Sequence, residues 1–159
     1  MNMRVGLGYD IHPFATADSD RPLVLAGLTI ANAVGLVGHS DADAVAHAVA
    51  DAILGAAGLG DLGTLFPASD SHYRDADSMV MLREVVALAA ADGWVVGNID
   101  VVINAEVPRL APHIEAMKSN LVAALRCDAV NLKPKRGEGL GAVGRSEGIA
   151  VQAVVMLTT

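Results

Sequence analysis

Hydrophobic and polar positions divide the chain into alternating strands and helices. Short apolar and β-branched runs predict strands over 3–12, 22–30, 94–105, 130–133 and 148–157. Gly27 divides the second of these runs, so it predicts either one strand or two short ones. Apolar residues at helical spacing predict helices over 41–57, 77–92 and 112–126. The polar stretch 61–75 predicts a loop, and the glycine-rich stretch 137–148 predicts a loop or a hairpin.

Strands that alternate with helices are typical of an α/β fold, here an α+β two-layer sandwich with the helices packed on one face of the sheet. Neither a linker nor an internal repeat interrupts the pattern, so residues 1–159 are predicted to form a single domain. The run 148–157 is apolar at nearly every position, so both of its faces need cover. Helices on one side leave the other face to a partner subunit.

Composition narrows the function classes. Hydrophobic residues make up 53% of the chain and aromatic residues only 3%, so the core must be built from Ala, Val, Leu and Ile. The net charge of −7 argues against a nucleic-acid partner, which requires a basic surface. The single cysteine, Cys127, excludes an intrachain disulfide and indicates a reducing compartment. Without a signal segment or an 18-residue apolar run, we expect no membrane association and a cytoplasmic location, or the plastid stroma if the source has plastids.

The first candidate site is GYDIH at residues 8–12, which lies at the end of the first predicted strand. Side chains two positions apart share one face of a strand, so Asp10 and His12 are expected to point the same way. Both residue types are zinc ligands, but two ligands do not complete a site.

A third ligand is available on the next helix. Asp43, His47 and Asp51 lie four residues apart and form a polar stripe, which is usually a solvated surface. Alternatively, His47 faces Asp10 and His12, which would leave one metal position open as in catalytic zinc sites. Asp43 or Asp51 would then hold the second imidazole nitrogen. Ser40 or Asp41 is the expected helix cap.

These motifs, in order, resemble one family. GYDIH, GHSDADAVAHAVADAILGAAGLGDLGTLFP, DADS and GRSEGIA together are similar to 2-C-methyl-D-erythritol 2,4-cyclodiphosphate synthases of the non-mevalonate isoprenoid pathway. The resemblance implies a mixed four-stranded sheet and a homotrimer with active sites at the subunit interfaces. It also implies an isoprenoid diphosphate on the trimer axis.

The resemblance assigns metals and substrate contacts to individual residues. It places Zn²⁺ on Asp10, His12 and His47, and a second divalent cation, Mg²⁺ or Mn²⁺, on Glu138. His39 takes the catalytic position that steadies the transition state. The positions implied to contact substrate are Asp10, His12, His39, Ser40, Asp61, Leu62, Gly63, Phe66, Asp70, Ala105, Pro108, Arg109, Leu110, Ala111, Glu138 and Arg145.

Four segments account for most of these contacts. Residues 61–63 are implied to grip the methylerythritol end of the substrate, and the loop 66–70 follows as a further contact, with Ala68 and Ser69 replacing its usual residues. Residues 105–111 are implied to form the cytidine pocket. Arg145 is implied to lie near the trimer axis.

The implied reaction is an internal phosphoryl transfer. The 2-phosphate of a CDP-linked alcohol attacks the β-phosphorus, CMP leaves, and a cyclic diphosphate remains. The same metal ligands would also serve a zinc phosphohydrolase, and a non-catalytic trimer that binds isoprenoid diphosphates is a further alternative.

The chain departs from the family in one loop. Lys135, Arg136 and Gly137 stand where the family has three threonines that contact the diphosphate, and Ala142 replaces an aromatic residue. Either backbone amides make the contacts, or Lys135 or Arg136 supplies charge to the phosphates, or the loop is impaired. We expect Arg136→Ala to lower turnover more than Lys135→Ala.

Overall fold

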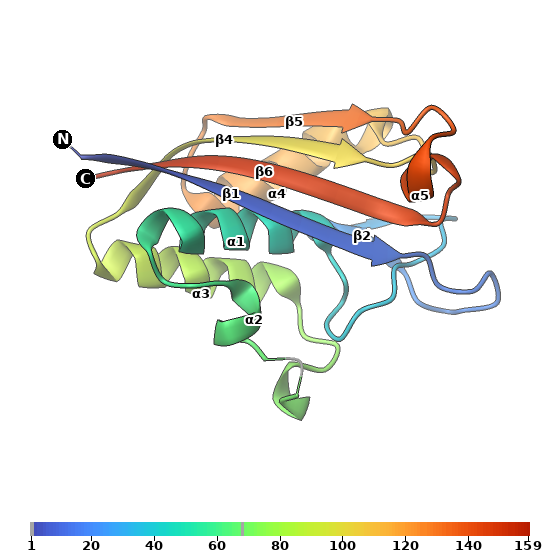
Figure 1. Ribbon diagram of the computed structural model, residues 1–159, viewed down its shortest axis with the longest axis horizontal. Helices are drawn as coiled ribbons and strands as arrows, with labels where there is room; N and C mark the ends of the chain where they lie inside the picture. Colours follow the sequence, from blue (N-terminus) through green and yellow to red (C-terminus); the bar gives the residue numbers. More distant parts are fainter. Residues whose placement is uncertain (1, 68) are drawn as a thin grey trace.

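The four long strands form one mixed sheet, as the sequence predicts (Figure 1). The computed structural model describes residues 2–67 and 69–159. The strand order is β1 (Met3–Pro13), β6 (Gly148–Thr158), β4 (Val95–Asn104) and β5 (Val130–Lys135). β4 and β5 are parallel, and the other pairs are antiparallel. Because β4 and β5 are parallel, the loops that follow them leave the sheet at the same edge.

Three long helices pack against this sheet (Figure 1). They are α1 (Ala44–Ala57), α3 (Ser78–Ala91) and α4 (Ile114–Leu125). Four short helical turns interrupt segments predicted as loops or precede α4: α2 (Leu62–Leu65), η1 (Ser71–Tyr73), η2 (Ala111–His113) and α5 (Gly141–Gly144). A segment this short shows no apolar periodicity, so the sequence pattern missed α2 and α5. No helix in the described part of the chain is long and apolar enough to cross a membrane.

Two glycines of β1 bring helix α1 directly onto the sheet. A Cβ on Gly8 would lie 1.8 Å from the carbonyl oxygen of Ala48, and a Cβ on Gly6 would lie 1.9 Å from that of Ala52. Only glycine permits such an approach of two backbones. Asp10 and His12 continue the same face of β1, so the contact positions them against the first turn of α1.

The start of α1 differs from the sequence prediction. The cap is Asp43, not Ser40 or Asp41, and its carboxylate accepts hydrogen bonds from the amides of Val45 and Ala46. The same carboxylate accepts two more from the Ala26 and Gly27 amides, at 2.8 and 2.6 Å.

Those two amides belong to the turn of a small hairpin. It joins β2 (Leu23–Leu25) to β3 (Leu28–Ile30), so the run 22–30 forms two strands. Burial raises the pKa of Asp43, against the hydrogen bonds from Ala46, Gly27 and Ala26. Asp43 is fully buried, so the predicted solvated stripe on α1 does not include it.

The sheet face away from the helices carries a row of exposed apolar side chains, which we call the open face. On β1 they are Met3, Val5, Leu7, Tyr9 and Ile11, and Val154 of β6 adds to them. Val5 and Leu7 are 71% and 69% exposed. Leu7 pairs in register with Val154, so the two strands present one continuous apolar surface. The apolar run 148–157 predicts this surface on the last strand, whereas most of it lies on β1.

Candidate metal centre and adjoining pockets

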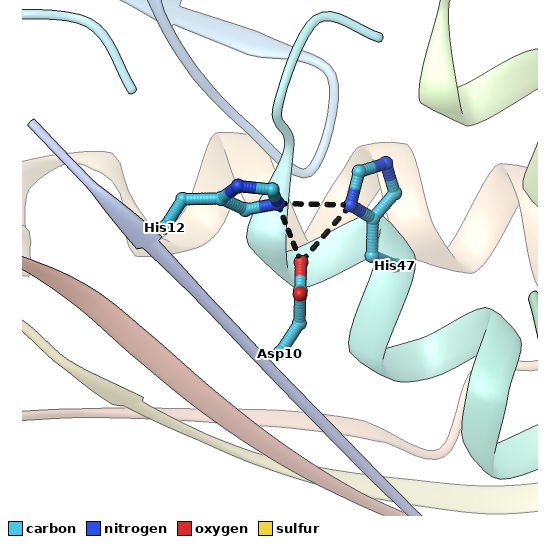
Figure 2. Close-up of side chains that lie close together, drawn as sticks. All are labelled: Asp10, His12 and His47. Carbon is cyan, nitrogen blue, oxygen red and sulfur yellow. Dashed lines mark hydrogen bonds and ion pairs between the residues drawn. The ribbon is translucent and has the colours of Figure 1, made fainter. Parts of the chain in front are cut away.

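Asp10, His12 and His47 converge on one point, and we call them the metal-ligand cluster (Figure 2). The Oδ2 of Asp10 lies 2.9 Å from His12 Nε2 and 2.9 Å from His47 Nδ1. The two imidazole nitrogens are 3.3 Å apart. The structure therefore confirms that these residues, which lie on β1 and α1, come together as the sequence predicts.

The ring nitrogens that face away from the cluster are each held by a hydrogen bond. His12 Nδ1 donates to the carbonyl oxygen of Val37 at 2.8 Å. His47 Nε2 donates to Ser78 Oγ at 2.8 Å, and Ser40 Oγ lies 3.0 Å from the same nitrogen. Such bonds favour, in each neutral ring, the tautomer in which His12 Nε2 and His47 Nδ1 offer their lone pairs to a metal ion once it replaces the contacts that these nitrogens make with Asp10. This donor set fits a divalent metal ion.

The prediction that Asp43 or Asp51 holds the second imidazole nitrogen of His47 was wrong. Asp43 is occupied by four backbone amides, and Asp51 accepts a hydrogen bond from the Leu62 amide at 2.7 Å. Instead, Ser78 accepts from His47 and donates its hydroxyl proton to Asp41. Asp41 also accepts a bond from the Ser78 amide at 3.0 Å, so it orients Ser78 from two sides.

The electrostatics of the metal-ligand cluster favour a charged carboxylate. Burial acts to raise the pKa of Asp10, but the hydrogen bonds from His12 and His47 outweigh it and hold that pKa well below its ordinary value. For His12, burial acts to lower the pKa, whereas the hydrogen bond to Asp10 raises it above its usual value. Asp10 is thus an anionic ligand throughout the neutral range.

A pocket of about 330 Å³ connects the metal-ligand cluster to the 61–63 segment. Asp61 caps α2 by accepting a hydrogen bond from the Thr64 amide at 2.7 Å. The bond from Leu62 to Asp51 joins α2 to α1. These contacts place Asp61, Leu62 and Gly63 beside the cluster, where the resemblance implied a substrate contact.

A second pocket, which we call the 105–111 pocket, lies where β4 and β5 end. Its volume is about 460 Å³. Ala105, Pro108, Arg109, Leu110 and Ala111 line it together, as the resemblance implied for the cytidine pocket. Pro134, Lys135 and Arg136 form the wall on the β5 side, with Glu106 and Val107 completing the lining. Among the described residues, the two pockets share no lining residue.

The remaining predicted contacts lie on separate loops. His39 Nε2 donates a hydrogen bond to the Asp70 carbonyl oxygen at 3.1 Å, which joins the two segments that carry them. Phe66 is buried, and its ring packs edge-on against Tyr73 at 5.2 Å. Ala68, within the predicted loop 66–70, lies outside the described residues.

Glu138 and Arg145 are exposed residues at the two ends of the loop around α5. Glu138 has a φ of 52°, a left-handed conformation that non-glycine residues rarely adopt. Arg145 Nε lies 2.6 Å from Glu147 Oε1. Neither residue lines the pocket beside the metal-ligand cluster or the 105–111 pocket.

No sequence pattern indicates the contact of Ser78 with His47, of Asp41 with Ser78, or of Glu106 with Arg136. DADS at 75–78 carries part of the family resemblance, and it ends in the serine that holds His47. Arg136 was expected to be available to phosphates, but its guanidinium binds Glu106. No spacing rule connects residues 30 or more positions apart, so only the fold reveals these pairs.

Comparisons with known proteins agree along the whole chain. The YgbB family model matches residues 3–158. A 2-C-methyl-D-erythritol 2,4-cyclodiphosphate synthase from Shewanella baltica strain OS223 is 52% identical, over 99% of this chain and 98% of that protein.

Solved structures agree as well. A 2C-methyl-D-erythritol-2,4-cyclodiphosphate synthase in its CDP-bound form is 39% identical, with a TM-score of 0.88 over 98% of this chain and 100% of the other. The bifunctional IspDF from Campylobacter jejuni is 41% identical, with a TM-score of 0.92 over 98% of this chain. This chain spans 42% of that longer protein.

Proposed function

The chain belongs to the YgbB family, with the 2-C-methyl-D-erythritol 2,4-cyclodiphosphate synthases, and we propose that it carries out their metal-dependent cyclisation in isoprenoid precursor biosynthesis. The substrate is 4-diphosphocytidyl-2-C-methyl-D-erythritol 2-phosphate. An oxygen of its 2-phosphate forms a bond to the β-phosphorus, and the bond from that phosphorus to the α–β bridging oxygen breaks. CMP leaves with the bridging oxygen, so the enzyme is a phosphorus–oxygen lyase.

The observation that carries this proposal is the convergence of Asp10, His12 and His47 beside the pocket of residues 61–63. The metal is Zn²⁺, since one carboxylate and two imidazoles are common zinc ligands. When bound, it supplies a Lewis acid that orients a phosphate oxygen. The attacking oxygen belongs to the substrate, so the protein needs no nucleophile of its own. Its contribution is to hold both ends of one molecule in reacting geometry.

Individual residues share this positioning work. Asp61, Leu62 and Gly63 hold the methylerythritol end, because they line the same pocket as the metal-ligand cluster. His39, which lies next to buried Ser40, stabilises charge in the transition state and is steadied by the Asp70 carbonyl. The 105–111 pocket receives the cytidine.

Glu138 offers a carboxylate to a second divalent cation, Mg²⁺ or Mn²⁺. Such cations are held by one or two carboxylates together with substrate phosphates. The exposure of Glu138 supports this assignment, because the carboxylate is accessible to a metal–phosphate complex. An anionic protein can bind a polyanionic substrate in this way, since metal ions offset the charge.

The active chain is a homotrimer with its active sites at the subunit interfaces. The apolar open face supports this, because an uncovered patch of large hydrophobic side chains is typical of a subunit interface. A second support is that the two pockets share no lining residue among those described. One substrate would then bind between the metal-ligand cluster of one subunit and the 105–111 pocket of the next. Arg145 lies near the trimer axis, where an isoprenoid diphosphate binds.

The location is the cytoplasm, or the plastid stroma if the source has plastids. The free thiol of Cys127 supports a reducing compartment.

The deciding experiment is to incubate purified protein, Zn²⁺ and Mg²⁺ with the CDP-linked substrate and to follow phosphorus NMR. We expect CMP and a cyclic diphosphate in equal amounts. Inorganic phosphate in place of the cyclic product would identify a phosphohydrolase. Unchanged substrate that nevertheless binds would identify a non-catalytic binding protein.

A further inference from the structure

An ion pair joins the two sides of the 105–111 pocket. Asn104 and Lys135, the last residues of β4 and β5, are register partners, and the Ala105 amide donates to the Lys135 carbonyl at 2.9 Å. Glu106 and Arg136 follow directly. Because the two strands are parallel, their next residues leave the sheet side by side.

Glu106 is the centre of this pair. Its Oε1 accepts from Arg136 Nε at 3.0 Å and also from Arg136 Nη2, and its Oε2 accepts from the Gly137 amide at 3.0 Å. The Glu106 side chain is 11% exposed, whereas that of Arg136 is 65% exposed and lies over it. The hydrogen bond from Arg136 holds the pKa of Glu106 below its ordinary value. Both guanidinium nitrogens share Oε1, and such charge-assisted bonds orient both partners.

The ion pair changes which cations are available to phosphate. Two basic side chains that line the pocket, Arg109 and Lys135, make no hydrogen bond or ion pair with the residues that the structure describes. Arg136 has its charge offset by Glu106. Lys133, two residues earlier on β5, is likewise paired, with its Nζ 2.5 Å from Asp100 Oδ2. Of the three cations at the end of β5, Lys133 and Arg136 are paired, and Lys135 has no ion-pair partner among the described residues.

We propose that Glu106 is a positioning residue for the nucleotide part of the substrate, acting through Arg136 and the Gly137 amide, and that Lys135 rather than Arg136 meets the phosphates. The inference rests on the proposed function, in which the 105–111 pocket binds the CDP group. Glu106 ties the β5 end to the pocket loop and so sets the width of the pocket. Residues 135–137 stand where the family has three threonines. In this segment Arg136 stabilises the wall of the 105–111 pocket, and Lys135 presents its unpaired charge to the phosphates.

The test is the affinity of the full-length protein for CDP, measured by calorimetry on single and double variants. We expect Glu106→Ala and Arg136→Ala each to raise the dissociation constant about tenfold, which corresponds to one charge-assisted hydrogen bond. The double variant should be no weaker than either single one, because both changes break the same pair. Lys135→Ala should also weaken binding, and its effect should multiply with that of Glu106→Ala.

Two further variants separate positioning from general damage. Glu106→Gln keeps a side-chain oxygen that can accept from the Arg136 guanidinium but loses the charge of the pair, so it should restore part of the affinity that Glu106→Ala loses. Asp100→Ala breaks the neighbouring Asp100–Lys133 pair between the same two strands and should leave CDP binding unchanged. In turnover, Glu106→Ala should raise KM for the CDP-linked substrate more than it lowers kcat.

Multiplicative effects of Glu106→Ala and Arg136→Ala would overturn the inference. So would weaker CDP binding in Arg136→Ala with unchanged binding in Glu106→Ala, because Arg136 would then contact the phosphates itself. If the expected CDP pattern is found without cyclic product, the proposed function fails and the inference stands. If cyclic product forms but all variants bind CDP as the wild type does, the inference fails and the function stands.

Discussion

The metal-ligand cluster and the 105–111 pocket differ in how their side chains are held. In the cluster, two glycines of β1 bring α1 into backbone contact, and a buried serine and a backbone carbonyl fix the imidazoles. In the 105–111 pocket, exposed Arg136 at the end of β5 forms an ion pair with the largely buried side chain of Glu106, which follows β4. Packing and buried hydrogen bonds therefore preorganise the first site, whereas charges that salt can screen maintain the second.

The largest effect is expected from removing a ligand of the preorganised site. His47→Ala should abolish bound zinc and cyclisation, because two ligands do not hold the ion at a catalytic site. The chain should remain folded, since His47 is one of the few residues of α1 that are not fully buried. Elemental analysis and circular dichroism check both points, with His113→Ala as a control that retains its zinc. A full zinc complement in His47→Ala would refute the cluster as the metal site.

The second-largest effect is expected from a change on the open face. It tests whether the metal-ligand cluster and the 105–111 pocket work within one subunit or between subunits. Leu7→Asp places a charge in the middle of the open face, where the side chain is 69% exposed. We expect the proposed trimer to dissociate and turnover to fall sharply, because the metal-ligand cluster of one subunit would lose the 105–111 pocket of the next. Light scattering measures the assembly. Val80→Asp, at an exposed apolar position on α3, should leave the trimer intact. A wild-type protein that is monomeric at micromolar concentration would contradict the assembly.

A smaller effect should follow from loosening the cluster without removing a ligand. Ser78→Ala removes the hydroxyl that connects His47 to Asp41. Loss of such a partner typically weakens metal binding by about 10–100-fold. Competition with a chromophoric chelator measures the zinc affinity, and Ser119→Ala on α4 serves as the control. Equal affinities in the two variants would mean that packing alone orients His47.

The smallest effect is expected at Glu138, which is exposed in the loop before α5. Glu138→Gln should raise the Mg²⁺ concentration needed for half-maximal turnover by a few-fold, because substrate phosphates and water molecules would supply the other ligands. Zinc content should not change. Glu115→Gln, on the exposed surface of α4, provides the comparison. An unaltered Mg²⁺ dependence in Glu138→Gln would remove this residue from the second cation site.

Local patterns were sufficient for the long elements, and they made Asp10, His12 and His47 available as candidate metal ligands. The strands 3–12, 94–105 and 148–157 match β1, β4 and β6 to within two residues. Side-chain alternation alone placed Asp10 and His12 on one face, and the helical period made His47 available. The family resemblance selected this set over a solvated stripe, which the stripe residue Asp43 does not join because it is fully buried.

The sequence by itself therefore determined the order of strands and helices, the family and the three metal ligands, because each depends on periodicity or on a short motif. Only the tertiary structure decided which groups support them. Ser78 reaches His47 because α3 packs against α1, and Glu106 reaches Arg136 because parallel strands end at the same edge. The same packing left the apolar residues of β1 uncovered. Such contacts join distant segments through the geometry of the fold, and no local periodicity encodes them.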